Sequence, residues 1–338
     1  MSEPNPGQSV PLVEIWRGEI LESVHRGTAA ICTPTGALVE AWGDPARVIL
    51  PRSACKMIQA LPLVESGAAG AQGLAPEHLA LATASHHGAP DHVGRVRAWL
   101  SGLGLGDDAL LCGAHPPNDK RARAALRQAG ETPDQVHNNC SGKHAGFLSV
   151  VRHTGAGPDY VAADHPVQRA VLEATEACAG ETAGGNAIDG CSAPNFALSV
   201  AGFATALARF ARPEAAFSGT RAAAAAALTA AMAAHPLLVA GEDSGTTALI
   251  RAASGGAVAK SGAEGVYAAI LPEPGLGIAV KIDDGAKRAS EAAIAGLMAR
   301  HGALDRGHPT YRAIADAPLV NWRGIAHGHL RLAAPLRA

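Results

Sequence analysis

The pattern of apolar and polar positions at the start of the chain is that of β-strands. Apolar and polar residues alternate at 13–16, and apolar-rich stretches at 28–32 and 37–42 flank the sequence Thr-Pro-Thr-Gly at 33–36. A period of two residues is typical of a strand with one buried face, and proline and glycine mark turns. Residues 13–42 are therefore predicted to open the fold as a hairpin.

Helical spacing replaces this pattern in the middle of the chain. Apolar positions recur every three to four residues from near Ser53, again at 77–82, and two alanine-rich stretches follow at 166–178 and 195–234. In the last stretch, three aromatic or aliphatic residues at i, i+4 and i+7 share one face of a helix: Phe203, Leu207 and Phe210. We predict that these helices are scaffold and not part of a site.

Strand-like patterning returns after Gly262. Apolar stretches at 266–271 and 278–282 enclose a Pro-Glu-Pro-Gly turn, and a helical pattern follows at 286–301. Strands at both ends with helices between them predict an α/β fold with one mixed, largely antiparallel sheet, whose end strands lie together under helices. Because no linker or repeat interrupts the pattern, we expect one domain over residues 1–338.

Composition excludes several classes of function. Of the 338 residues, 48% are hydrophobic and 17% are charged, which is typical of a globular protein with a sizeable core. A formal net charge of −2 and an aromatic content of 4% provide neither a basic surface nor stacking platforms for a nucleic acid. We therefore expect no nucleic-acid partner.

Two segments bear on the location of the protein. The most apolar helical stretch, 222–240, is mostly alanine and is interrupted by His235-Pro236, so we expect no membrane-spanning helix. Residues 1–6 contain an acid and two prolines in place of the basic and apolar residues of an export signal. We therefore expect a cytoplasmic protein.

A Ser-x-x-Lys motif lies at a predicted strand-to-helix junction, in the segment Arg52-Ser53-Ala54-Cys55-Lys56. Positions i and i+3 share a helical face, so the Ser53 hydroxyl and the Lys56 amine can lie close together. A neutral lysine can serve as the base for a serine nucleophile, and burial or a nearby cation favours the neutral form. Because the motif is short, it also occurs by chance.

A second element, Lys260-Ser261-Gly262, immediately precedes a predicted strand. Lys-[Ser/Thr]-Gly accompanies Ser-x-x-Lys in penicillin-recognising serine enzymes. In that arrangement the second lysine lies on an edge strand beside the nucleophile, where it can lower the pKa of the first amine or hold a substrate carboxylate. The alternative is a solvated lysine at the end of a loop.

A third group places cysteines beside basic residues. Cys140-Ser141-Gly142-Lys143-His144 is followed along the chain by Asp189-Gly190-Cys191. Two thiolates suit zinc, but there is no Cys-x-x-Cys pair, so the residues leave three interpretations open: buried free thiols, a zinc site, and a Cys140/His144 nucleophile and base. Adjacent side chains diverge, so we interpret His86 and His87 as ordinary polar residues.

Five segments, in order and over nearly the whole chain, resemble the rhizobial-type (class 3) L-asparaginase II family. The two longest, Asn-Asn-Cys-Ser-Gly-Lys-His and Asp-Gly-Cys-Ser-Ala-Pro, are specific, whereas Ser-x-x-Lys is not. One departure is Ala89, where we expect an acidic residue. The segments are Pro51 to Lys56, Ala84 to Gly88, His137 to His144, Asp189 to Pro194 and Ala259 to Gly265.

The resemblance implies a serine-β-lactamase/glutaminase-like fold, a homodimer, and hydrolysis of L-asparagine to aspartate and ammonia. It also implies two Ser-Lys pairs, Ser53 with Lys56 and Ser85 with Lys260. It further implies one zinc ion per chain held by Cys140, Lys143 and Cys191. Finally, it places Arg52 against the α-carboxylate of the substrate and Asp189 against its α-ammonium group, which suits the charge of each side chain.

Together these observations predict an amidohydrolase that works through an acyl-enzyme. We expect Ser53, deprotonated by Lys56, to attack the side-chain amide, with Ser85 and Lys260 relaying protons; Ser85 is the alternative nucleophile. Three other functions remain open: a penicillin-recognising hydrolase, a threonine-nucleophile asparaginase using Gly245-Thr246-Thr247, and a zinc-binding protein without catalysis.

Overall fold

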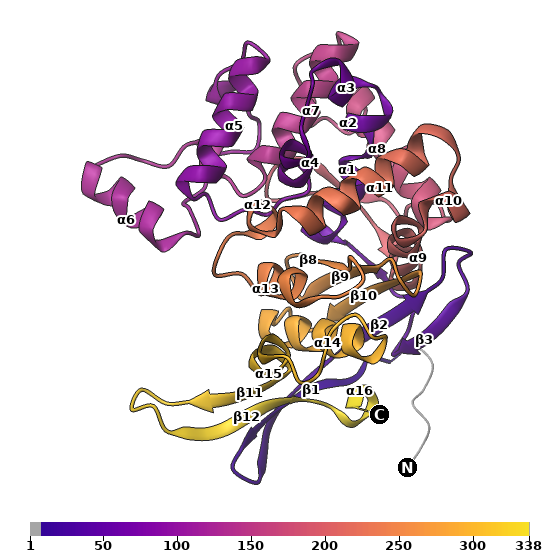
Figure 1. Cartoon of the computed structure of the whole chain (residues 1–338), viewed down its shortest axis with the longest axis vertical. Helices are drawn as coiled ribbons and strands as arrows, with labels where there is room; N and C mark the ends of the chain where they lie inside the picture. Colours follow the sequence, from indigo (N-terminus) through magenta and orange to yellow (C-terminus); the bar gives the residue numbers. More distant parts are fainter. Residues whose placement is uncertain (1–7, 338) are drawn as a thin grey trace.

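The computed structural model describes residues 8–337 and contains one large antiparallel sheet with helices packed on it (Figure 1). The residues 1–6, on which the expectation of a cytoplasmic location rested, lie outside the described residues. In the order of pairing, the strands of this sheet are β11 (Asp316–Val320), β12 (Ala326–Leu332), β1 (Val10–Arg17), β2 (Ile20–Cys32), β10 (Leu276–Ile282), β9 (Val266–Leu271) and β8 (Val258–Ser261), and β3 (Leu38–Trp42) pairs with β2.

The two ends of the chain meet inside this sheet. Strand β2 pairs with β10, with Ala30 opposite Ala279, and β1 pairs with β12, with Ile15 opposite Leu330. The predicted α/β fold, the second hairpin and the adjacency of the end strands are confirmed. Residues 13–42 were predicted to form one hairpin, but they contribute to three strands, β1, β2 and β3, because a further turn at Gly18 divides the first part. Two small sheets complete the strands: β4 (Val48–Ile49) with β7 (Leu198–Ser199), and β5 (Asn186–Ile188) with β6 (Pro194–Phe196).

Most helices lie between β4 and β8 in the sequence, and most of these lie in the upper part of the molecule in Figure 1. They are α1 (Lys56–Gln59), α2 (Leu61–Glu65), α3 (Ala68–Ala71), α4 (Pro76–Ala82), α5 (Pro90–Gly102), α6 (Lys120–Ala129), α7 (Ser141–Thr154), α8 (Pro166–Ala179), α9 (Val200–Ala211), α10 (Pro213–Ala216), α11 (Gly219–Ala234), α12 (Pro236–Ala240) and α13 (Gly245–Ala252). The C-terminal part adds α14 (Lys287–Arg300), α15 (Pro309–Ala315) and α16 (Ala334–Arg337), and three 3₁₀ helices are η1 (Arg52–Cys55), η2 (Asp107–Ala109) and η3 (Gln135–His137).

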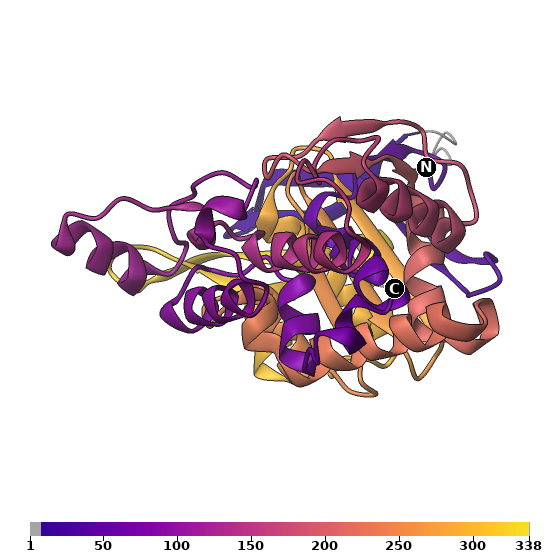
Figure 2. The same cartoon turned by 90° about the horizontal axis from the view of Figure 1, so that it is seen from above.

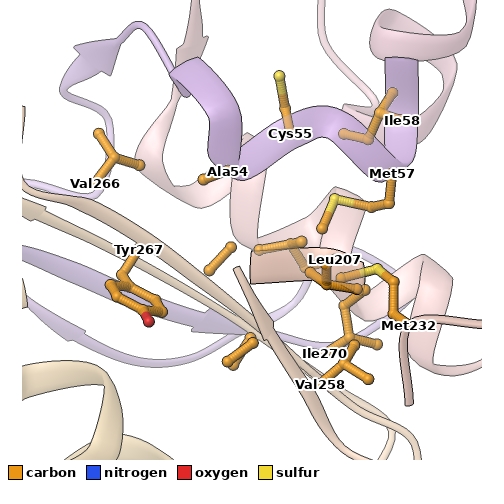
Figure 3. Close-up of a cluster of buried hydrophobic side chains, with 14 of the residues drawn as sticks. Ala54, Cys55, Met57, Ile58, Leu207, Met232, Val258, Val266, Tyr267 and Ile270 are labelled. Atoms are coloured by element: carbon orange, nitrogen blue, oxygen red, sulfur yellow. The ribbon is translucent and has the colours of Figure 1, made fainter. Parts of the chain in front are cut away.

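Strands β9 and β10 are covered on both faces, since almost every residue in them is buried. Helices α9 and α14 both pack on these two strands. The approach of α9 is so close that a Cβ atom on Gly277 would lie 2.2 Å from the Ala204 carbonyl oxygen. Figure 3 shows the core beside this contact, where Met57, Leu207 and Ile270 meet.

The predicted helix at 195–234 is wrong in its bounds. The residues up to Ser199 include β6 and β7, so this part of the stretch is not helical. Helix α9 begins after Ser199, whose side chain caps it by accepting a hydrogen bond from the backbone N–H of Gly202. Pro213 lacks an N–H group and starts a new helix, α10, so the alanine-rich stretch is three helices and not one. Its apolar face is buried as predicted.

Helix α6 projects from the rest of the molecule, as both views show (Figures 1 and 2). The Asp119 side chain caps it by accepting from the backbone N–H of Ala122, and Gly130 ends it in a left-handed conformation. None of its residues is buried. Within the described part of the chain, no helix is long and apolar enough to cross a membrane.

Candidate active site

Helix η1 presents Ser53 immediately after a strained residue. Arg52 has φ = +53°, in the left-handed region that side chains other than glycine seldom adopt. Two contacts hold it there: its backbone N–H donates to Asn195 Oδ1 at 3.0 Å, and its guanidinium is paired with Asp189. Strain held in this way is common at functional sites.

The Ser85 hydroxyl lies between two lysine amines. Lys56 Nζ is 3.0 Å and Lys260 Nζ is 2.8 Å from Ser85 Oγ. Lys56 also donates to the Ala84 carbonyl, and Lys260 to the Ser261 carbonyl. Both lysine side chains are fully buried. The structure therefore brings three of the four predicted Ser-Lys residues into one hydrogen-bonded cluster, which we name the lysine–serine cluster.

The charge of Lys56 affects the neighbouring amine of Lys260. Burial, and then the positive charge of Lys56, hold the pKa of the Lys260 amine well below its usual range. Burial opposes a charged amine because an apolar interior solvates it poorly, and a second cation nearby adds repulsion. Both effects favour the neutral form of the Lys260 amine, which is the form that can accept a proton from Ser85.

Ser53 makes no hydrogen bond with Lys56 among the described residues, although the two are in adjoining helical turns. Instead Ser53 faces the same pocket as Ser85. This pocket has a volume of about 330 Å³ and is lined by polar groups and glycines: Ser53, Ser85, His87, Asn118, Asn139, Ser244, Ser261, Gly262, Ala263, Glu264, Gly265, Gly285, Lys287 and Ser290.

Gly262 allows the loop after β8 to reach Ser53. A Cβ atom at this position would lie 2.8 Å from the Pro51 carbonyl oxygen and 3.2 Å from the Ala54 nitrogen. Only glycine permits so close an approach. The loop after Lys260 and the first turn of η1 therefore form adjoining walls of the pocket.

The two predicted substrate anchors are bonded to each other. Arg52 Nη2 lies 2.7 Å and Arg52 Nε lies 2.9 Å from Asp189 Oδ1. The Asp189 side chain is 10% exposed, so this ion pair is partly shielded from water. A ligand with one positive and one negative group could exchange partners with it.

Cys140, Lys143 and Cys191 form a second buried group, which we name the thiol–lysine cluster. Lys143 Nζ lies 3.1 Å from Cys191 Sγ, and no more than 4% of any of the three residues is exposed. Cys140 and Lys143 come from the start of α7, whereas Cys191 follows β5. All six cysteines of the protein are free thiols.

Charges in the thiol–lysine cluster are coupled. Hydrogen bonding from Cys140 and the charge of Lys143 hold the pKa of the Cys191 thiol far below its usual value, although burial opposes this. Burial alone would lower the pKa of Lys143, but the negative charges of Cys191 and Cys140 raise it. Burial lowers the pKa of the neighbouring His144 to about 4.

The donor atoms of this cluster suit a soft cation. Two thiols and an amine converge, and the buried His144 Nε2 beside them has no hydrogen-bond partner among the described residues. Those residues contain no group of three or more His, Cys, Asp or Glu side chains arranged for a metal. Lys143 would therefore have to act as the third ligand, in its neutral form.

Sequence reasoning missed several residues of the site. His86, interpreted as an ordinary polar residue, is fully buried and bonded to Ser141. Asn118 and Lys287 line the pocket without belonging to a recognisable motif, and Asn139 lines it as well. Asn139 alone carried a signal, because it lies within the specific Asn-Asn-Cys-Ser-Gly-Lys-His block.

Comparison with known proteins gives one family match. A protein-family model described as L-asparaginase II matches residues 13–332. No curated protein matches the chain. Among solved structures, a β-lactamase from Mycobacterium bovis is 15% identical, with 82% of this chain and 95% of that chain covered at a TM-score of 0.39. A putative β-lactamase from Bacteroides dorei is 11% identical, with 76% and 85% covered at a TM-score of 0.43.

Proposed function

Because the chain belongs to the L-asparaginase II family, we propose that it hydrolyses the side-chain amide of L-asparagine to L-aspartate and ammonia. The observation that supports this most directly is the lysine–serine cluster. A serine hydroxyl lies within hydrogen-bond reach of a buried lysine whose pKa is lowered, and such a pair can generate the nucleophile that acyl transfer requires. That hydroxyl opens on a pocket with a second serine, Ser53.

We propose Ser53 as the nucleophile. Support comes from the strained Arg52 that precedes it and from its position in the pocket, where no hydrogen bond within the described residues restrains its hydroxyl. Its oxygen attacks the amide carbon, and the C–N bond then breaks to release ammonia. Water hydrolyses the resulting ester to aspartate and free Ser53.

The proton of Ser53 needs an acceptor, and the lysine–serine cluster offers a path. Lys56 passes a proton to Ser85 Oγ while Ser85 passes its own proton to Lys260. This leaves Lys56 neutral, so it can take the proton of Ser53 and later give it to the departing nitrogen. The same steps in reverse serve the attack of water.

Ser85 is the alternative nucleophile, since its hydrogen bond with Lys260 would allow direct deprotonation. Ser85 is less suited to be both the nucleophile and the proton relay, because an acylated Ser85 could no longer relay protons. Mass spectrometry of a stalled acyl-enzyme would identify the serine that carries the aspartyl group.

We propose that Arg52 and Asp189 bind the two charged groups at the α-carbon of asparagine. Their own ion pair supports this, because it places a cation and an anion side by side at the residue immediately before Ser53, and a substrate with both charges can pair with each. The substrate carboxylate would replace Asp189 on the guanidinium, and the substrate ammonium would bind the freed Asp189.

We also propose that Cys140, Lys143 and Cys191 hold one zinc ion per chain. A zinc ion bound there would supply positive charge that favours thiolates and a neutral amine. Without a metal, the pairing of Lys143 with the Cys191 thiolate gives the same residues a stable arrangement. The homodimer and the cytoplasmic location remain predictions from the sequence.

The penicillin-recognising hydrolase is kept as the second candidate, because two lysines around one serine also suit β-lactam chemistry. The threonine-nucleophile interpretation is disfavoured. Thr246 and Thr247 are fully buried, and their hydroxyls bond to Tyr267 and to the Gly241 carbonyl at 2.7 and 2.6 Å.

The test is ammonia release by the purified protein from L-asparagine, with nitrocefin as the competing substrate. We expect asparagine turnover that Ser53→Ala and Ser85→Ala each reduce by a factor of about a hundred or more, with the double variant little worse because the serines act as a unit. Nitrocefin turnover without ammonia release would replace our proposal with the second candidate. Metal binding with neither activity would favour the non-catalytic zinc protein.

A further inference from the structure

We propose that His86 is a positioning residue, which ties the loop carrying Ser85 to the start of α7 and so keeps the Ser85 hydroxyl between its two lysines. The catalytic importance of this role rests on the proposed function, whereas the contacts of His86 do not depend on it. His86 follows Ser85 directly in the chain and is fully buried.

Both ring nitrogens of His86 have partners that fix the tautomer. The backbone N–H of Gly88 donates to Nδ1 at 3.1 Å, so Nδ1 is an acceptor and bears no proton. Nε2 therefore carries the proton and donates to Ser141 Oγ at 2.9 Å. The Ser141 hydroxyl in turn donates to the Val136 carbonyl at 2.9 Å, which leaves its oxygen free to accept from His86.

This arrangement excludes His86 as the base for Ser85. Burial, followed by the charge of His92, holds the pKa of His86 well below its usual range. A proton added at Nδ1 would face the N–H of Gly88, so two donors would oppose each other. The ring is a fixed, neutral connector, and a role in proton transfer would require it to lose one of its bonds.

The backbone of the loop is held on both sides of Ser85. The Ser85 N–H donates to the Val239 carbonyl at 2.9 Å, and the His86 N–H donates to the Asn139 carbonyl at 3.2 Å. Gly142 lets α7 approach closely, since a Cβ there would lie 2.4 Å from the Leu81 carbonyl oxygen. The loop is thus clamped between α12 and the segment that begins α7.

His92 supports the ring of His86 from the opposite side. The two rings are stacked with centroids 4.9 Å apart and planes inclined by 13°. His92 Nε2 lies 2.9 Å from the Leu237 carbonyl in α12, the helix that also accepts from Ser85. His86 thus connects the loop to α7, while His92, in the first turn of α5, connects the start of α5 to α12.

The connection to α7 has a consequence for the thiol–lysine cluster. Ser141, which accepts from His86, lies between Cys140 and Lys143 in the sequence. A change at His86 should therefore disturb Ser85 on one side and the first turn of α7 on the other. If His86 had a merely structural role, its substitution would lower the stability of the protein without affecting these two segments in particular.

Two substitutions separate the two bonds of the ring. His86→Gln retains an N–H group near the position of Nε2, and so the bond to Ser141, but loses the acceptor for Gly88. His86→Asn retains that acceptor but cannot reach Ser141. If the tie to α7 positions Ser85, kcat for asparagine should fall about tenfold or more in His86→Asn and about threefold or less in His86→Gln, because small misplacements of catalytic groups are costly. KM should change little in either variant.

His165 provides a matched control. Its Nδ1 accepts from the Val167 N–H at 3.1 Å and its Nε2 lies 2.9 Å from the Gly157 carbonyl, yet it lines no part of the pocket. His165→Asn should lower the melting temperature as His86→Asn does, while kcat stays at the wild-type value. Ser141→Ala removes the tie from the other end, and Ser141→Thr should retain it; these variants replace His86→Asn if that protein does not fold.

Hydrogen exchange of peptides covering 84–88 and 138–144 tests the positioning without relying on activity. Exchange should accelerate in His86→Asn and Ser141→Ala but not in His165→Asn. Equal kcat in His86→Asn and His165→Asn, with unchanged exchange in both peptides, would overturn the positioning role. If the wild type released no ammonia from asparagine while the exchange differed as expected, the proposed function would fail and the positioning role would stand.

Discussion

Lys260 of the lysine–serine cluster and Lys143 of the thiol–lysine cluster are both buried, but their pKa values are shifted in opposite directions. Lys260 is 0% exposed and Lys143 is 2% exposed. Burial and the charge of Lys56 lower the pKa of Lys260, whereas the charges of Cys191 and Cys140 overcome burial and raise that of Lys143. The charges of the neighbouring groups, and not the depth of burial, decide which lysine can act as a base.

This difference divides the work of the site between two regions. A neutral amine can accept a proton, so the lysine–serine cluster suits chemistry. A charged amine beside thiolates forms an ion pair, which gives way to coordination only when a metal displaces its proton. The following predictions test that division, beginning with the largest expected effect.

Replacing Lys260 by arginine should show the difference between the lysine–serine cluster and the thiol–lysine cluster most strongly. A guanidinium stays protonated at any ordinary pH, so it cannot accept the Ser85 proton. We expect Lys260→Arg to lower kcat for asparagine by a factor of about a thousand, equal to about 4 kcal/mol in barrier height. Steady-state ammonia release measures this.

Lys143→Arg is the counterpart. It keeps a cation beside the Cys191 thiolate, so the melting temperature of the metal-free variant should be closer to that of the wild type than the melting temperature of Lys143→Met is.

A Lys260→Arg enzyme with more than a tenth of wild-type kcat would contradict the assignment of Lys260 as the proton acceptor.

Removing one thiol should abolish the proposed metal site. We expect about one zinc per chain in the wild type, and a loss of affinity of about a hundredfold or more in Cys140→Ala or Cys191→Ala, since each removes a soft ligand of a small set. Elemental analysis after dialysis gives the content directly. Cys178→Ala is the control, because burial raises the pKa of that thiol to about 12 and it lies outside the cluster. Unchanged zinc in both test variants would identify these residues as buried thiols.

Stability should depend on pH through Lys260. In the unfolded chain a lysine binds its proton up to a pH of about 10.4, whereas folded Lys260 releases it at lower pH. The unfolded state therefore binds more protons in this window, and the free energy of unfolding should rise with pH by up to about 1.4 kcal/mol per unit. Lys260→Met should remove this rise.

Denaturant titrations at several pH values with a chelator present provide the measurement. Lys56→Met should raise the pKa of Lys260 by removing the adjacent charge, and so move the rise to higher pH. An identical slope in the wild type and in Lys260→Met would show that Lys260 is charged in the folded protein.

Arg52→Ala should have the smallest effect and act on binding. We expect KM for asparagine to rise about tenfold or more, because one charge-assisted contact is lost, while the zinc content stays constant. Glutamine should react far more slowly than asparagine in the wild type, since one extra methylene displaces the amide carbon from Ser53. Unaltered KM in Arg52→Ala, or similar kcat/KM for the two amides, would refute the anchoring of the α-groups.

Much of the sheet could be predicted because its strands have simple periods. The stretches at 266–271 and 278–282 are apolar except for Lys281 and became β9 and β10, which are almost entirely buried. Strand β12, with the sequence Ala-His-Gly-His-Leu-Arg-Leu, was missed because its polar residues hide the period. The breaks between α9, α10 and α11 were missed because alanine continues through all three and only Pro213 marks one boundary.

The candidate site was predictable in its residues but not in its bonds. The Ser-x-x-Lys spacing suggested that Lys56 would face Ser53, yet its amine donates to Ser85, whose position depends on where the loop after α4 runs. No local pattern could reveal that Lys260, which is 175 residues from Ser85, would reach the same hydroxyl, and only the family resemblance paired these two residues. Nothing in the sequence around His86 indicated its burial, since burial there results from α7 and α12 closing over the loop.

The projecting helix α6 has a practical consequence for anyone preparing this protein. Trypsin cleaves after lysine and arginine in segments that can unfold locally, and a helix of this length without packed side chains unfolds at little cost. Four such residues lie in α6: Lys120, Arg121, Arg123 and Arg127. A nick there would leave the sheet intact but would free the segment that holds Asn118 at the pocket. Limited digestion should therefore yield two fragments that remain associated, and the same position should tolerate the insertion of a tag or a reporter domain.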